Sequence, residues 1–200
     1  MIDWINKNWV EITGAVLAFI YLILEIKQNW IFWIVGIISS AFYVYIFFHA
    51  GLYAEMGLNF YYVIMSVYGL YCWKFASEAE SKDFSFQQIN AKTTLLFISA
   101  FVILFGFIFF ILYRYTDSKI PVPDTLIAVL SIIATWMAAK KIVECWYIWI
   151  FVNIFATGLY IYQKLYPTAI LFTFYSIFSF IGLIEWHKSV KKNDSAHTKF

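Results

Sequence analysis

Apolar residues fill long runs of the chain, and polar residues gather in short segments between them. The runs lie roughly at residues 10–27, 31–49, 57–74, 93–113, 124–139, 145–163 and 168–186. A helix of about 20 mostly apolar residues spans the hydrocarbon core of a bilayer. The pattern therefore predicts an all-α integral membrane protein with seven transmembrane helices, of which the helix at 124–139 is the shortest.

The composition supports this prediction. The chain is 63% hydrophobic and 13% charged, with a mean hydropathy of +0.75, whereas about a quarter of the residues in an ordinary soluble domain are charged. The longest loop, "SEAESKDFSFQQINAK", is too short to form a domain. We therefore expect one transmembrane domain over residues 1–200, with no cleavable signal peptide, because the start "MIDWINKNWVEITG" lacks a basic segment and a cleavage site.

Basic residues fall unevenly on the two sides of the predicted bundle. The side that holds the N-terminus carries Lys7, Arg114, Lys119 and Lys164. The other side carries Lys27, Lys74, Lys82, Lys92, Lys140, Lys141, Lys188, Lys191, Lys192 and Lys199. Because Lys and Arg concentrate in cytoplasmic loops, the N-terminus is expected outside and the C-terminus, with a basic tail at 187–200, in the cytosol. The net charge of +2 gives no reason to expect a nucleic acid partner.

The chain also repeats itself. Trp30 and Trp33 align with Trp146 and Trp149 at an offset of 116. At an offset of 113, Leu52, Tyr53, Tyr62, Ser66, Gly69, Leu70 and Trp73 align with Leu165, Tyr166, Tyr175, Ser179, Gly182, Leu183 and Trp186, and a loop-length difference would explain the change of offset. Residues 10–74 and 124–186 then form two three-helix repeats around a linker helix at 93–113. This predicts a 3+1+3 parallel-repeat arrangement, as in SWEET proteins, with a substrate site near the bilayer midplane. The alternative is a duplication that only builds a bundle.

Four side chains form a stripe on one face of the sixth predicted helix: Trp146, Trp149, Asn153 and Tyr160. Asn153 lies about 10 Å along the helix from Trp146, close to mid-bilayer, so its amide must face the bundle. It then binds either a ligand or a neighbouring helix. Asn59 is the matching amide in the third helix. For Trp30, Trp73, Trp146 and Trp186, an interfacial aromatic belt is the alternative to ligand contact.

The stripe, read as W-x-x-W-x-x-x-N-x-x-x-x-x-x-Y, resembles the signature of the Pnu family of bacterial vitamin transporters. The resemblance extends from about Gly14 to Trp186 and includes "LEIKQNWIFWIVGI" and "GLYIYQKLYPTAILFTFYSI". It implies uptake of nicotinamide riboside or thiamine across the bacterial inner membrane by facilitated diffusion, with trapping by a cytosolic kinase. Trp33, Asn59 and Tyr62 of the first repeat would complete the site.

The chemistry suits either vitamin. Both are flat aromatic cations, and each indole or phenol face attracts such a cation by roughly 0.5–2 kcal/mol. The carboxylates of Glu11, Glu25, Glu144 and Glu185 lie near helix ends, so no mid-bilayer carboxylate is available for the ion coupling that such groups commonly serve. Uncoupled transport is therefore expected, with no cofactor and no metal.

Other functions are weakened by what the sequence lacks. The seventh helix has no lysine for a retinal Schiff base, since none lies between Lys164 and Lys188. No H-E-x-x-H or G-x-S-x-G motif indicates an enzyme. A vitamin-binding membrane receptor, or a subunit of an ATP-driven vitamin importer, stays open as an alternative, as does a homo-oligomer.

Overall fold

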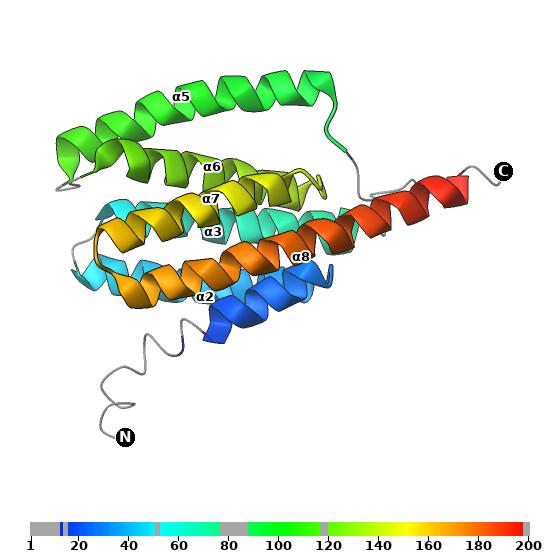
Figure 1. Ribbon diagram of the computed structural model, residues 1–200, viewed down its shortest axis with the longest axis horizontal. Helices are drawn as coiled ribbons and strands as arrows, with labels where there is room; N and C mark the ends of the chain where they lie inside the picture. Colours follow the sequence, from blue (N-terminus) through cyan, green and yellow to red (C-terminus); the bar gives the residue numbers. More distant parts are fainter. Residues whose placement is uncertain (1–12, 14–15, 51–52, 77–87, 117–119, 198–200) are drawn as a thin grey trace. The chain divides into compact units, whose positions relative to one another are not determined.

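The computed structural model describes residues 13, 16–50, 53–76, 88–116 and 120–197. Its helices are Val16–Ile26, α2 (Ile31–Ala50), α3 (Tyr53–Leu70), the π-helix η1 (Tyr71–Ala76), α5 (Ala91–Tyr115), α6 (Pro121–Ala139), α7 (Cys145–Tyr162) and α8 (Tyr166–His197) (Figure 1). Each predicted apolar run contains a helix, so the all-α prediction is confirmed. By length and composition, five of the described helices can cross a membrane: Ile31–His49, Ala91–Tyr115, Pro121–Ala139, Cys145–Tyr162 and Thr168–Lys191.

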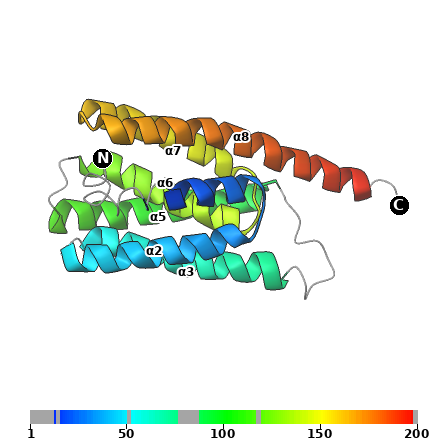
Figure 2. The same ribbon diagram turned by 90° about the horizontal axis from the view of Figure 1, so that it is seen from below.

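The chain divides into two compact units, Met1–Ala79 and Glu80–Phe200. In the first unit, α2 packs along α3. In the second, α5 packs on α6, α6 on α7, and α7 along α8, so that α7 and α8 run side by side in Figures 1 and 2. The helix predicted as a linker, α5, thus belongs to the second unit. Almost all of α5 lies outside the core of the chain, whereas half of α6 is buried.

Among the helix ends that the structure describes, three share a local motif in which a residue just past the last turn lies in the left-handed region. These residues are Gln28 (φ 57°), Lys141 (φ 55°) and Lys164 (φ 61°). In each case two backbone N–H groups bond back to the last turn, as in a Schellman motif. After α6, Lys141 N donates to Ala138 O over 3.0 Å and Ile142 N to Met137 O over 2.9 Å. These bonds use carbonyl groups that a helix end leaves unpaired.

The turns after Val16–Ile26 and after α6 are copies of one another at an offset of 113. Five backbone hydrogen bonds recur, among them Gln28 N to Glu25 O (3.0 Å), which matches Lys141 N to Ala138 O (3.0 Å). The others are Lys27 N to Ile23 O, Asn29 N to Leu24 O, Phe32 N to Asn29 O and Trp33 N to Trp30 O, matching Lys140 N to Trp136 O, Ile142 N to Met137 O, Cys145 N to Ile142 O and Trp146 N to Val143 O. The offset of 116 predicted for the first tryptophans is therefore wrong: Trp33 corresponds to Trp146. A W-x-x-W motif slides onto itself by three residues, and this produced the false register.

Each unit has a core built from two tryptophans and a glycine. Trp33 is fully buried, lies against Gly69 and meets Trp73 edge to face at 6.3 Å between ring centroids. In the second unit, Trp146 lies against Gly182 and meets Trp186 at 5.5 Å. The belt interpretation is wrong for the three tryptophans Trp73, Trp146 and Trp186, because their rings are buried in these cores. Trp30 is half-buried, with the ammonium of Lys74 over its ring at 4.2 Å.

The last helix is longer than a bilayer is thick. α8 has 32 residues, about 48 Å at 1.5 Å per residue, against a hydrocarbon core of about 30 Å. Figure 2 shows its C-terminal part running past the N-terminal end of α7. The predicted basic tail is thus helical as far as His197, and it begins beside an exposed ion pair between Lys188 Nζ and Glu185 Oε1 at 2.6 Å.

Candidate functional site

Three of the predicted site residues carry a buried hydrogen-bond donor without an acceptor. The indole N–H groups of Trp33, Trp146 and Trp149 are buried and have no hydrogen-bond partner among the described residues. A buried donor left unpaired costs roughly 1–3 kcal/mol. Such donors are expected where water or a ligand supplies the acceptor. The stripe of α7 holds two of the three, so it offers hydrogen-bond donors as well as aromatic faces.

Asn153 faces a neighbouring helix, as its position in an apolar segment requires. Its Nδ2 donates to Ser179 Oγ of α8 over 3.0 Å, and Ser179 Oγ in turn donates to Tyr175 O over 2.8 Å. Both side chains are buried. The amide therefore does bind a neighbouring helix, which is one of the two alternatives that the sequence left open. The bond uses one N–H of an amide that has two donors and an acceptor oxygen, so the group keeps capacity for a ligand.

The far end of the stripe is aromatic. Tyr160 is half-buried near the end of α7, and its ring lies 5.0 Å from that of Phe172 on α8. Phe172 contacts Tyr175 at 5.4 Å between centroids. Since Tyr175 also accepts the hydrogen bond from Ser179, the aromatic end of the stripe and the Asn153 amide are joined through one segment of α8.

The predicted contributions from the first repeat lie in the other unit. Trp33 is on α2 and fully buried, while Asn59 and Tyr62 are on α3 and half-buried. Tyr62 meets Tyr61 at 5.6 Å between centroids. The approach of these three residues to the stripe stays a prediction.

The corrected register shows why the stripe occurs only once in the chain. At an offset of 113, Trp149 corresponds to Gly36 and Asn153 to Ser40. A Cβ on Gly36 would meet the Tyr21 ring at 3.1 Å, and the counterpart of Tyr21 is Ala134. The first repeat therefore has a tyrosine next to a glycine, and the second repeat has Ala134 and Trp149 at the two matching positions. The large aromatic ring is thus on the first of the two helices in the first repeat and on the second helix, as part of the stripe, in the second repeat.

Sequence reasoning missed several polar groups that the structure buries. Ser179 is 1% exposed and Glu25 3%, and Glu144 has one buried carboxylate oxygen, Oε2, without a partner among the described residues. The match of Ser179 with Ser66 at an offset of 113 was the available signal for the first, since both serines are buried. Glu25 and Glu144 do lie near helix ends as predicted, but nothing in their spacing indicates burial.

Comparisons with known proteins relate this chain to one family of transporters. The family model described as "Nicotinamide mononucleotide transporter" matches residues 8–188. The chain is 26% identical to the nicotinamide riboside transporter PnuC of Neisseria mucosa, covering 93% of this chain and 74% of that protein. It is 21% identical to PnuC of Escherichia coli K12, covering 95% and 90%.

A solved structure gives the same result for the fold. The crystal structure of the vitamin B3 transporter PnuC superposes with a TM-score of 0.74 at 25% identity, covering 95% of this chain and 85% of that one. The family model matches far more than half of the chain, and five described helices are able to span a membrane, so this chain belongs to the nicotinamide mononucleotide transporter family.

Proposed function

We propose that this protein takes up nicotinamide riboside across the bacterial inner membrane by facilitated diffusion, and that a cytosolic kinase traps the product. As a member of its family the chain is a multi-pass membrane transporter and not an enzyme. The choice of nicotinamide riboside as the substrate rests on one observation: more than nine-tenths of the chain is similar to relatives named as nicotinamide riboside transporters. Thiamine, the substrate of a sister branch, is the competitor to test, because it too is a flat aromatic cation that indole and phenol faces attract.

The proposed architecture is a 3+1+3 parallel repeat. Its support is the pair of matching turns and the pair of Trp–Gly–Trp cores, all related by the single offset of 113. In this arrangement α5 is the additional helix between the repeats. Repeats of this kind place the substrate at their interface near the midplane.

The stripe of α7 then recognises the vitamin from the second repeat. Trp149 stacks on the cationic pyridinium ring, and Asn153 hydrogen-bonds the carboxamide or ribose. Trp146 and Tyr160 frame the pocket, while Trp33, Asn59 and Tyr62 face it from the first repeat. The unpartnered indole N–H groups support this assignment, because the ribose hydroxyls and the carboxamide oxygen of the ligand are hydrogen-bond acceptors.

Transport is proposed to be uncoupled and inward. Glu25 lies one residue before the end of the short apolar helix Val16–Ile26, Asp124 lies in the first turn of α6, and Glu185 is exposed beside Lys188. None of these three carboxylates is at the middle of a span, where coupling groups are commonly found. The four basic residues on the side of the N-terminus, against ten on the other, support an external N-terminus and a cytosolic C-terminus.

Calorimetry on the purified protein tests the substrate. Nicotinamide riboside, thiamine, riboflavin and a neutral nucleoside such as uridine are titrated separately. The proposal expects nicotinamide riboside to bind most tightly and uridine not to bind, since uridine lacks the cationic ring. Tighter binding of thiamine would move the protein to the sister branch. Equal binding of uridine would show that binding does not need a cationic ring, which would contradict the cation–π argument.

A further inference from the structure

A groove of about 360 Å³ lies on the second unit, away from the stripe. It is formed where α5 and α7 begin and α6 ends, and its walls include Phe97, Ile98, Ile133 and Met137. Its innermost residue on α6 is Leu130, nine residues before Ala139. At 1.5 Å per residue the groove therefore reaches about 14 Å inward from the end of that helix. Its volume lies within the usual range of roughly 300–1,000 Å³ for ligand pockets.

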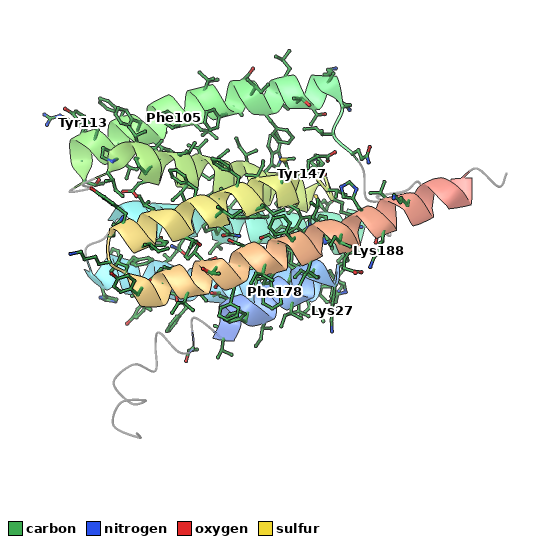
Figure 3. All side chains as sticks on the ribbon, in the orientation of Figure 1. Lys27, Phe105, Tyr113, Tyr147, Phe178 and Lys188 are labelled. Atoms are coloured by element: carbon green, nitrogen blue, oxygen red, sulfur yellow. The ribbon has the colours of Figure 1, made fainter. Side chains whose placement is uncertain are left out.

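The mouth of the groove holds the carboxylate of Glu144, one oxygen of which has no hydrogen-bond partner among the described residues. Glu144 lines the groove and precedes the first residue of α7, and its side chain caps no backbone N–H group. Its Oε2 is buried and accepts no hydrogen bond from the described residues. The other two polar side chains of the lining have partners: Thr94 Oγ1 donates to Asn90 O over 3.0 Å, and the hydroxyl of Tyr147, a residue labelled in Figure 3, lies 3.4 Å from His187 Nε2. Glu144 is thus a carboxylate with one unsatisfied oxygen in an otherwise mostly apolar lining.

The apolar walls and the carboxylate of Glu144 together favour one class of ligand. A buried carboxylate is costly unless a cation or a donor pairs with it. A vitamin with a ribose would leave its hydroxyl groups unpaired along apolar walls, so the substrate fits poorly. A lipid tail suits the walls, and an ammonium at its head suits Glu144. The turn beside Glu144 carries Lys140, whose charge suits the phosphate of the same headgroup.

We propose that this groove binds phosphatidylethanolamine, with an acyl chain along α5 and α6 and the headgroup ammonium on Glu144. The carboxylate lies at the membrane surface, because α6 ends and α7 begins there, and the chain runs into the hydrocarbon. Phosphatidylcholine fills the same groove with its tail, but its quaternary ammonium has no N–H to donate. Phosphatidylglycerol has no ammonium at all. The lipid preference therefore depends on one side chain, whatever the transported substrate.

Native mass spectrometry measures the preference. The protein is released from bilayers of phosphatidylethanolamine, phosphatidylcholine and phosphatidylglycerol in equal parts, and the retained lipids are counted. The wild type is expected to retain phosphatidylethanolamine over phosphatidylcholine by at least about threefold, since hydrogen bonds to charged groups are the strong ones. Glu144→Gln should bring this ratio to about one. Glu185→Gln, which removes an exposed carboxylate outside the groove, should leave the ratio unchanged.

A second pair of variants tests the groove itself. Ile98→Trp places a larger side chain in the groove and should lower retention of all three lipids, whereas Ile103→Trp on the same helix lies outside the lining and should not. Equal retention of the lipids by the wild type, or an unchanged preference in Glu144→Gln, would overturn the proposal. So would a change of oligomeric state in Ile98→Trp without loss of lipid, which would assign the groove to a second copy of the chain. Calorimetry with nicotinamide riboside should be unaffected by Glu144→Gln, and its loss would assign the groove to the substrate instead.

Discussion

At the scale of single residues, the polar side chains inside the apolar helices are the best indicators of function. Asn153 and Ser179 are buried and bonded to each other across α7 and α8. The hydroxyl of Ser179 also donates to its own helix, so it keeps a partner when the amide is removed. The interhelical bond and the proposed ligand bond can therefore be separated by mutating the two partners one at a time.

Asn153→Leu should weaken binding of the vitamin by roughly 1–3 kcal/mol, because polar atoms of the ligand lose their partner. Its melting temperature should fall only slightly, since interhelical hydrogen bonds in membranes contribute about 0.6 kcal/mol. Ser179→Ala removes the same interhelical bond and leaves the amide in place, so it should lower the melting temperature similarly and leave affinity nearly intact. Calorimetry and thermal unfolding of both variants check this. Equal loss of affinity in the two, or none in Asn153→Leu, would assign Asn153 to packing.

Sequence alone predicted the helices well and the contacts between them poorly. Long apolar runs identify helices because their length matches a bilayer, and every run contained one. The predicted register of the repeat was wrong at Trp149, whose counterpart is Gly36, because the W-x-x-W motifs match in residue type but not in position. Burial of Trp73, Trp146 and Trp186 depends on glycines and rings on other helices. The partner of Asn153 lies 26 residues away, and no local pattern shows it.

The Trp–Gly contacts between helices make a direct prediction. In Gly182→Ala the new Cβ would fall on the indole of Trp146, and overpacking of this kind costs typically about 1–3 kcal/mol. Gly158 lies inside α7 with no atom within 4 Å of an added Cβ. Gly158→Ala should therefore be neutral or stabilising by up to about 1 kcal/mol. Thermal unfolding in detergent compares the two, and equal melting temperatures would contradict the tight contact.

In the turns that end the helices, we expect the replacement of a lysine by glycine to stabilise the fold. Lys141 has a φ of 55°, a conformation that costs a side-chain-bearing residue roughly 1–2 kcal/mol. Burial also lowers the pKa of its ammonium, which shows that the folded chain disfavours the charged form. Lys141→Gly should consequently raise the melting temperature. Lys164→Gly should behave alike, as the sequence has a glycine, Gly51, 113 residues earlier.

Lys140 supplies the control for that measurement. Its φ is −88°, which a lysine adopts without strain, so Lys140→Gly gains nothing from glycine's freedom and should be destabilising. A melting temperature that falls equally in Lys140→Gly and Lys141→Gly would show that the left-handed turn carries no strain.

The distribution of charge over the whole molecule predicts its orientation. In a variant without the native cysteines, Ser81→Cys lies in the lysine-rich loop and Gln163→Cys in the turn after α7, on the opposite side. A membrane-impermeant maleimide added to intact cells should label the second cysteine and not the first. Labelling at position 81 alone would reverse the orientation and, with it, the direction proposed for uptake.

The central claim is that this protein alone carries nicotinamide riboside down its gradient, and uptake of the radiolabelled compound by liposomes that hold only this protein tests it most directly. The internal concentration should rise to the external one and stop there, and an imposed proton or sodium gradient should not change that level. Empty liposomes, and liposomes with Asn153→Leu, should fill more slowly. Accumulation above the external concentration under either gradient, or no uptake by the folded protein, would contradict the account.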